Sequence, residues 1–281
     1  MVNSSSGAEN APANSKFYAS VIDLVGSKSF FSSLANLLEQ VVAYDGLIVF
    51  LYDSKNAPSS LGCFKCAMDF QSGLENYLKY TYVLNPVYRA FLGNIAPGAY
   101  LITELMPEGY TEQVANSELR IRIEDNEVIG YRTPGWPKNM TDVLGLIQLP
   151  GEIMIEFDFI TSQTDDQTNQ CLKSLNSIFP VLASTVRKHF EVTPQDREVG
   201  NAKPSHEDRF QGFGKPVLTS REQSVVKMIL TGHSSNSIAL SLGISMPTVK
   251  THRRNVYAKL NISSQAELFN LFIHSLVDSA A

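Results

Sequence analysis

The chain has 281 residues, with 23 Lys and Arg against 28 Asp and Glu, and a formal net charge of −5. This length predicts two domains, and 43% hydrophobic and 18% charged residues are typical of a globular protein. The longest apolar run, Gly46 to Tyr52, is far shorter than the ~20 residues that span a bilayer. Three cysteines cannot build a disulfide framework, and no secretory signal opens the chain. We therefore expect a cytoplasmic protein without a membrane partner.

The N-terminal elements predict an α+β domain over residues 16–190, an α-β-α sandwich, behind a disordered leader at 1–15. Apolar periodicity predicts helices over 16–25 and 28–43, a strand over 46–52 and a second strand near 62–68. A helix over about 71–84 and another from Pro86 follow. Extended segments are predicted at 99–104, 126–132, 143–149 and 152–160, with Pro150-Gly151 as the last hairpin turn. A helix over about 165–191, kinked at Pro180, closes the domain.

Two cysteines have CxxC spacing, Cys63 and Cys66, but no second CxxC or His pair accompanies them. A four-ligand zinc site would need Cys171 and a distant histidine, and His189 is the only one before residue 191. A redox CxxC normally lies at a helix N-terminus, whereas this one lies in a predicted strand. We therefore predict no metal and no cofactor.

Charge is unevenly divided along the chain. Residues 1–200 carry 14 Lys and Arg against 23 Asp and Glu, whereas residues 201–281 carry 9 against 5. A Pro-, Gly- and charge-rich segment, 191–215, predicts a linker between the two parts. A basic C-terminal part is typical of a segment that meets a polyanion, although a chance imbalance stays open.

The C-terminal segment 216–281 has the pattern of a helix-turn-helix. Thr219 and Glu222 have the spacing of a capping box, which predicts the start of a first helix that stops near Gly232. Ser235 or Asn236 caps a short second helix, and Gly243 supplies the left-handed turn after it. Pro247 opens a third helix with a basic outer face, and a fourth helix follows from about Ser264 to Val277. A helix of this kind fits the major groove of DNA.

This segment resembles the LuxR-type DNA-binding domain over about 60 residues. The matching positions are Leu218, Thr219, Arg221, Glu222, Gly232, Ile238, Ala239, Leu242, Ile244, Ser245, Thr248, Val249, His252, Lys259 and Leu260. The resemblance implies that Lys250, Thr251 and Arg254 face base edges, and that Ser245, Thr248, Arg253 and Lys259 lie nearer phosphates. It also implies a symmetric dimer contact through the fourth helix. The chain departs from the family pattern at Asn236-Ser237, where Lys-Glu is usual, and at Gln265, where Arg is common.

The N-terminal domain resembles the GAF/PAS class and the autoinducer-binding domain of LuxR proteins. Its Tyr-rich segment ends in Asn85-Pro86, where the autoinducer receptors carry an Asp that holds the ligand amide. An aromatic pocket with polar groups is therefore a hypothesis, with the candidates Tyr77, Tyr80, Asn85, Tyr88, Tyr110 and Trp136. The alternative is that these aromatic residues are core.

The combined pattern predicts a transcription regulator and not an enzyme. No Gly-rich phosphate loop, GxSxG elbow or HExxH motif is present, and Asp165-Asp166 follows the last strand, which disfavours a phosphoreceiver domain. The expected partners are a pseudo-palindromic double-stranded operator, a second copy of the chain and a small-molecule effector, with a contact to RNA polymerase left open. The alternative for the N-terminal domain is a dimerisation or protein-docking module without a ligand.

Overall fold

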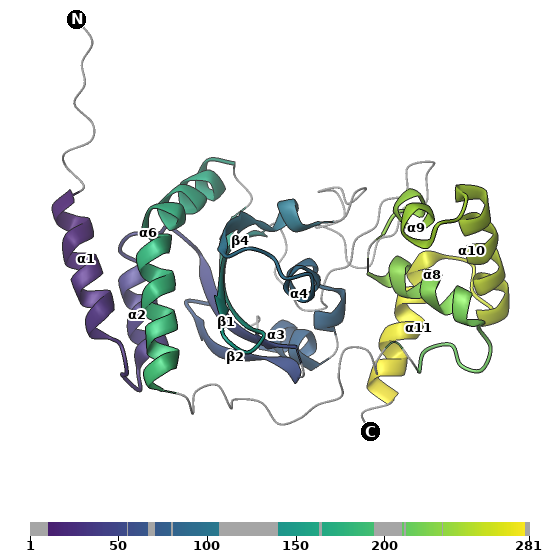
Figure 1. Cartoon of the computed structure of the whole chain (residues 1–281), viewed down its shortest axis with the longest axis horizontal. Helices are drawn as coiled ribbons and strands as arrows, with labels where there is room; N and C mark the ends of the chain where they lie inside the picture. The colour runs from purple at the N-terminus through teal and green to yellow at the C-terminus, as the bar shows by residue number, and fades with distance from the viewer. Residues whose placement is uncertain are drawn as a thin grey trace, which may run out of the picture.

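The computed structural model describes residues 11–54, 56–66, 71–79, 81–106, 140–162, 165–193, 210, 212–231 and 233–278. The N-terminal part is a curved sheet between two layers of helices, and the C-terminal part is a group of helices beside it (Figure 1). Among the described residues, no helix combines the length and the apolar character that crossing a bilayer needs.

The sheet is antiparallel throughout, with the strand order β2-β1-β5-β4-β3. Its strands are β1 (Gly46–Asp53), β2 (Asn56–Phe64), β3 (Gly98–Leu101), β4 (Met140–Leu149) and β5 (Ile153–Ser162). The β4–β5 hairpin turns at Pro150-Gly151, as predicted, and Gly151 has a φ of +89° that favours glycine.

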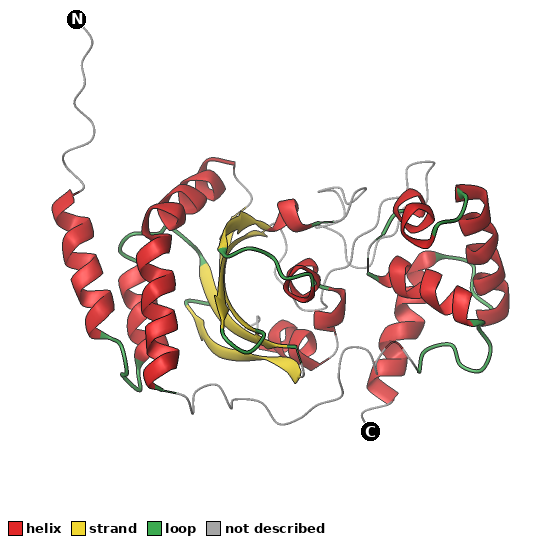
Figure 2. Ribbon diagram, viewed as in Figure 1, coloured by secondary structure: helices red, strands yellow, loops and turns green. Residues whose placement is uncertain are grey.

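Helices cover both faces of this sheet (Figure 2). One face, here the α6 face, packs against α1 (Ala11–Asp23), α2 (Phe30–Leu38) and α6 (Asp165–Val192). The other, here the concave face, curves around α3 (Gln71–Lys79), the 3₁₀ turn η2 (Thr81–Leu84) and α4 (Pro86–Leu92). A second 3₁₀ turn, η3 (Ile102–Leu105), follows β3. In Figure 1 α6 changes direction along its length, as expected for a helix that contains Pro180.

Several predicted boundaries were wrong. The second strand covers 56–64 and not 62–68, so Cys66 lies beyond its end. The helix predicted over 71–84 ends at Lys79, and 81–84 form a 3₁₀ turn. Helix α1 begins at Ala11, inside the predicted leader, so the leader prediction fails for residues 11–15. The strand predicted at 126–132 lies outside the described residues.

The C-terminal helices follow the predicted pattern. They are α8 (Ser220–Leu230), α9 (Ser235–Leu242), α10 (Met246–Leu260) and α11 (Gln265–Asp278). The Thr219–Glu222 capping box is present, and Gly243 adopts the left-handed conformation with a φ of +62°. The cap of α9 is Ser234, whose hydroxyl accepts the Ser237 N–H, so the prediction of Ser235 or Asn236 was wrong by one or two residues. The expected α+β sandwich with a small helical domain is confirmed.

The end of the predicted linker belongs to the helical domain. Phe210 stacks on Phe272 with ring centroids 4.9 Å apart, and Phe213 meets the same ring edge-on at 5.2 Å. All three side chains are buried. The linker prediction was wrong here. Segment 191–215 has the Pro-, Gly- and charge-rich composition of a linker, but it also contains two aromatic residues that complete the core of the helical domain.

Glu222 connects the start of α8 to the end of α10. Its carboxylate accepts the Thr219 backbone N–H at 2.8 Å and binds the Lys259 ammonium at 2.7 Å. The Lys259 hydrogen bond is the main cause that lowers the pKa of Glu222 to about 2. The carboxylate therefore stabilises the domain at pH values above the usual glutamate pKa of about 4.3, and this contribution is lost as the pH falls toward 2.

We expect Glu222→Ala to lower the free energy of unfolding of the helical domain by about 1–2 kcal/mol, because a helix cap is lost. Hydrogen exchange of the α8 amides in the whole chain measures this change. The matched control is Glu39→Ala, which removes a half-exposed ion pair to Lys65 at 2.9 Å. Its expected cost is below about 1 kcal/mol. Equal effects of the two substitutions in their own domains would contradict a special role for Glu222.

Candidate functional site

Helix α10 presents a polar, basic face to solvent. Ser245, whose hydroxyl accepts the Thr248 N–H at 3.2 Å, caps the helix. Val249 and Val256 are fully buried, which fixes the rotation of the helix on the domain. The exposed residues include five candidates for DNA contact, Ser245, Thr248, Lys250, Thr251 and Arg254. Lys250 and Arg254 are one turn apart, so both cations project from the same side.

The two remaining candidates for DNA contact are engaged within the domain. Arg253 donates to the Ser235 hydroxyl at 3.0 Å and to the Gln265 side-chain oxygen at 3.0 Å. Lys259 is bound to Glu222. Gln265, one of the departures from the family pattern, is buried and therefore braces α10 against the start of α11.

A hollow of about 500 Å³ lies beside this basic face, lined by Lys250, Arg253, Arg254, Tyr257, Ala258, Ile262 and Ser263. Three of these seven side chains are cationic and none is acidic. A hollow of this kind attracts an anionic group, and a nucleic-acid phosphate is one such group.

The concave face holds two buried carboxyl groups, Glu156 and Asp158, which are 2% and 4% exposed. The Tyr52 hydroxyl donates to Glu156 and lies 2.6 Å from the Tyr77 hydroxyl. Burial raises the pKa of Glu156 to about 8, against the lowering effect of the Tyr52 hydrogen bond. Burial also raises the pKa of Asp158 well above its usual range, and Asp142 adds to this shift. Within the described part of the chain, one oxygen of Asp158 has no hydrogen-bond partner.

The structure describes three of the six residues predicted for the aromatic pocket. Tyr77 and Tyr88 are buried on the concave face, and Tyr88 packs on Tyr52 with centroids 5.8 Å apart. The Asn85 oxygen accepts the Val87 N–H at 2.7 Å and caps α4. Three candidates, Tyr80, Tyr110 and Trp136, lie outside the described residues.

Our sequence interpretation missed Tyr52, Glu156 and Asp158. A signal was present: residues 153–160 alternate along a strand, which places Glu156 and Asp158 on one face, among apolar neighbours. Acidic residues at alternate positions of an otherwise apolar strand are exceptional, because burying them is costly.

A polar contact joins the N-terminal domain to the helical domain. The Arg89 guanidinium of α4 donates to the Thr231 carbonyl oxygen at the end of α8 and lies 2.8 Å from His233 Nε2. His233 Nδ1 lies 2.9 Å from the Ser237 hydroxyl. This arrangement requires an unprotonated Nε2 that accepts from Arg89. Burial, and then the charge of Arg89, lower the pKa of His233.

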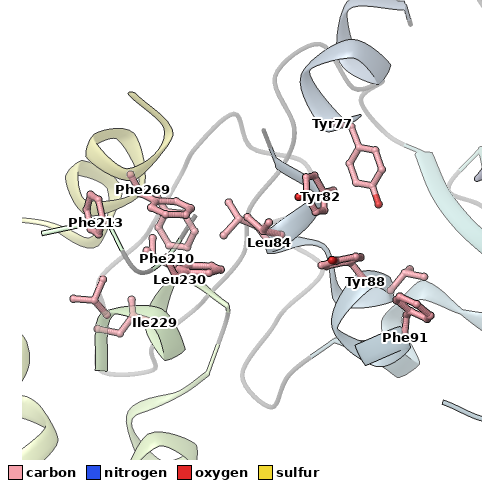
Figure 3. Close-up of a cluster of buried hydrophobic side chains, with 14 of the residues drawn as sticks. Tyr77, Tyr82, Leu84, Tyr88, Phe91, Phe210, Phe213, Ile229, Leu230 and Phe269 are labelled. Carbon is pink, nitrogen blue, oxygen red and sulfur yellow. The ribbon is translucent and has the colours of Figure 1, made fainter. Parts of the chain in front are cut away.

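An apolar contact runs beside it. Figure 3 shows Leu84 between the tyrosine cluster of the concave face and the residues Phe210, Leu230 and Phe269 of the helical domain. These side chains are all buried in one continuous cluster. The concave face and the helical domain therefore share a core, and a change in one reaches the other through packed side chains.

Three solved structures resemble the chain at low similarity. The ligand-binding domain of VqsR from Pseudomonas aeruginosa has 14% identity and a TM-score of 0.44, covering 64% of this chain and 96% of its own. Escherichia coli SdiA has 13% identity and a TM-score of 0.31 over 88% of this chain and 90% of its own. SdiA in complex with octanoyl-rac-glycerol has 14% identity and a TM-score of 0.33, with 98% and 97% covered.

Sequence comparison is specific for the C-terminal segment. The model of the bacterial regulatory proteins of the luxR family matches residues 216–272. A curated protein of Aeromonas salmonicida, provisionally described as an HTH-type transcriptional regulator in the exeN 3′ region, is 50% identical over 46 residues. That match covers 16% of this chain and about a quarter of the relative. Residues 216–272 are therefore a helix-turn-helix domain of the kind found in the luxR family of bacterial regulatory proteins.

Proposed function

We propose that the chain is a transcription regulator that binds a pseudo-palindromic operator as a two-fold homodimer. The observation that carries this proposal is the basic face of α10, where Lys250, Thr251 and Arg254 are exposed on a helix whose other side is buried. A helix presented in this way enters the major groove, where Arg pairs with guanine edges and Lys contacts bases or phosphates. Ser245 and Thr248, at the positive N-terminal end of α10, contact phosphate.

The roles of Arg253 and Lys259 follow from their partners. Because Lys259 is bound to Glu222, it acts first as a brace and contributes positive potential at longer range. Arg253 lines the basic hollow while it is held by Ser235 and Gln265, so its guanidinium is already oriented when a phosphate arrives. An oriented cation loses less side-chain entropy on binding.

Dimerisation uses α11 in this proposal. Leu271 is 38% exposed on α11, whereas Phe269 and Phe272 on the same helix are buried within the domain. Two-fold pairing would cover Leu271 with its symmetry mate and set the spacing of the two α10 helices.

A small-molecule effector binds the concave face and controls operator affinity. Its support is the buried Asp158 oxygen without a hydrogen-bond partner among the described residues. Such an atom costs about 1–3 kcal/mol, and a ligand that donates a hydrogen bond to it recovers that cost. Tyr77 and Tyr88 contribute aromatic surface to the same site. The other residues predicted for the pocket, Tyr80, Asn85, Tyr110 and Trp136, are further candidates for contact with the effector.

The effector signal reaches the DNA-binding domain through Arg89 and Leu84. Leu84 belongs to the apolar cluster of the concave face, and Arg89 binds the end of α8. The short segment that contains both residues therefore connects the concave face to the helical domain. A ligand that prefers one position of α4 shifts the equilibrium between docked and undocked domains, and thereby operator affinity.

Replacing Arg254 tests the DNA contact. With an operator selected from random duplexes, we expect Arg254→Ala to lose about 1–3 kcal/mol of discrimination, because a bidentate base contact is removed. Fluorescence anisotropy with operator and random duplex measures both affinities. The control Lys173→Ala removes one exposed cation from α6 and should leave discrimination unchanged. Equal losses on both duplexes would show that Arg254 contacts only phosphate.

Native mass spectrometry tests the homodimer and the effector together. We expect a dimer that carries a non-covalent small mass, which is lost on denaturation. Asp158→Leu should abolish the retained mass, because the acceptor is gone, while the dimer persists and its operator affinity no longer responds to the effector. Asp158→Asn, which keeps an acceptor, is the matched control. A clean dimer from every expression medium would instead support a docking module without a ligand.

Low pH should loosen the contact between the domains. Because the pKa of His233 is lowered in the docked state, the undocked state binds more protons. Docking is therefore strongest above about pH 6.5 and weakens as the pH falls below that value. Hydrogen exchange of the amides of 231–238, compared at pH 7.5 and 5.5 after correction for intrinsic rates, measures docking. Arg89→Ala should expose these amides at both pH values, and a pH response that survives in this variant would contradict the assignment.

A further inference from the structure

Cys63 and Cys66 lie on the same face of the sheet. Cys63 pairs across the ladder with Ile48, and Ile48 pairs on its other side with Asp158. Ile48 belongs to the concave-face cluster, and side chains directly opposite each other share a face. Cys63, Ile48 and Asp158 therefore form one row of side chains across β2, β1 and β5 on the concave face. Cys63 is at the end of this row, on the edge strand β2. Cys66 packs against that same cluster, with its Sγ 3.4 Å from the Phe64 carbonyl oxygen.

A left-handed residue folds the chain back between the two thiols. Strand β2 ends at Phe64, and Lys65 follows with a φ of +58°, a conformation that a lysine rarely adopts. Two contacts hold it there: its ammonium lies 2.9 Å from Glu39 and donates to the Tyr44 carbonyl oxygen at 3.0 Å. After this turn the Cys66 thiol donates to the Phe64 carbonyl oxygen at 3.4 Å and lies 3.8 Å from the Leu47 carbonyl oxygen, and its side chain interacts with that of Cys63.

The two thiols differ in exposure and in acidity. Cys63 is exposed, whereas Cys66 is half-buried. The hydrogen bond from Cys66 lowers the pKa of Cys63, although burial and Asp158 oppose this shift. The same hydrogen bond, together with burial, raises the pKa of Cys66. The third cysteine, Cys171, is buried against the α6 face, and burial raises its pKa to about 12. Cys63 is thus the accessible nucleophile, and Cys171 is an internal control.

We propose that Cys63 and Cys66 form a peroxide-reactive pair that closes to a disulfide at the edge of the concave face. The Cys63 thiolate attacks one oxygen of a hydroperoxide; the O–O bond breaks, an S–O bond forms, and the other oxygen leaves with a proton as an alcohol or water. Cys66 then attacks the sulfenic sulfur of Cys63. The S–S bond forms, the S–O bond breaks, and the oxygen leaves as water with the Cys66 proton. Two thiols are oxidised by two electrons, and the hydroperoxide is reduced.

The arrangement favours the attack of Cys66 on the sulfenic sulfur of Cys63. The Lys65 turn follows directly after β2, and both thiols face the concave side of the sheet, so the resolving thiol lies beside the accessible one. This site is independent of the proposed effector, although a disulfide here would restrain the edge of the row that contains Asp158.

The test is peroxide treatment of the reduced whole chain, followed by alkylation and mass spectrometry. We expect two of the three thiols to lose alkylation and the intact mass to fall by two hydrogens. Tryptic cleavage after Lys65 separates the cysteines, so the disulfide appears as two peptides joined through Cys63 and Cys66. Cys66→Ser should accumulate a dimedone adduct at Cys63, because no resolving thiol remains.

Cys171→Ser is the matched control, and it should form the 63–66 disulfide as the native chain does. Circular dichroism of each serine variant verifies that the fold is retained. Three results would overturn the proposal: both thiols still alkylated after peroxide, sulfinic acid at Cys63 without a linked pair, or a disulfide that includes Cys171.

Discussion

Along β1, β4 and β5, side chains point alternately to the α6 face and to the concave face, and this alternation organises the N-terminal domain. In β5 it sends Ile155, Phe157 and Phe159 toward α6. The residues between them, including Glu156 and Asp158, are sent to the concave face. A shift of register by one residue would exchange these sets and bury the carboxyl groups under α6. The long β4–β5 ladder, from Met140↔Ser162 to Leu149↔Ile153, prevents such a shift.

The C-terminal domain depends on polar contacts that hold α10 in place. Glu222 joins the start of α8 to Lys259, and Gln265 and Ser235 hold Arg253. These contacts occupy two of the four clustered cations and leave Lys250 and Arg254 directed to solvent. The basic cluster is therefore divided between cations bound within the domain and cations left open to solvent. Charge alone is therefore a poor guide to which cations are available to a binding partner.

Local rules predicted the elements whose ends are marked by special residues. The capping box at Thr219, the left-handed Gly243, Pro247 in the first turn of α10 and the Pro150-Gly151 hairpin are all present as predicted. Boundaries without such markers were less predictable. The strand β2 lacks a regular apolar alternation, and its edge position leaves most of its side chains partly exposed. Its start was therefore placed too late.

The candidate sites show the same contrast. The matching residues of α10 were accessible from sequence because the family pattern is contiguous. The acidic site could not be assembled from sequence, since Tyr52, Tyr77 and Glu156 come from three separate elements that only the folded sheet brings together. The contact of Arg89 with His233 joins residues 144 positions apart, and no local pattern predicts such a pairing. Ser237, a departure from the family pattern, gains a role as the partner of His233.

The buried rings of Phe210 and Phe213 affect where the helical domain can be separated from the N-terminal domain. The family match begins at Pro216, but a fragment cut there would lose both rings and expose Phe272 to water. Exposed aromatic surface of that kind promotes aggregation. A chimaera that places this helical domain behind a different N-terminal domain therefore has to join upstream of Phe210. It also needs a substitute for the surface that Leu84 and Arg89 now cover.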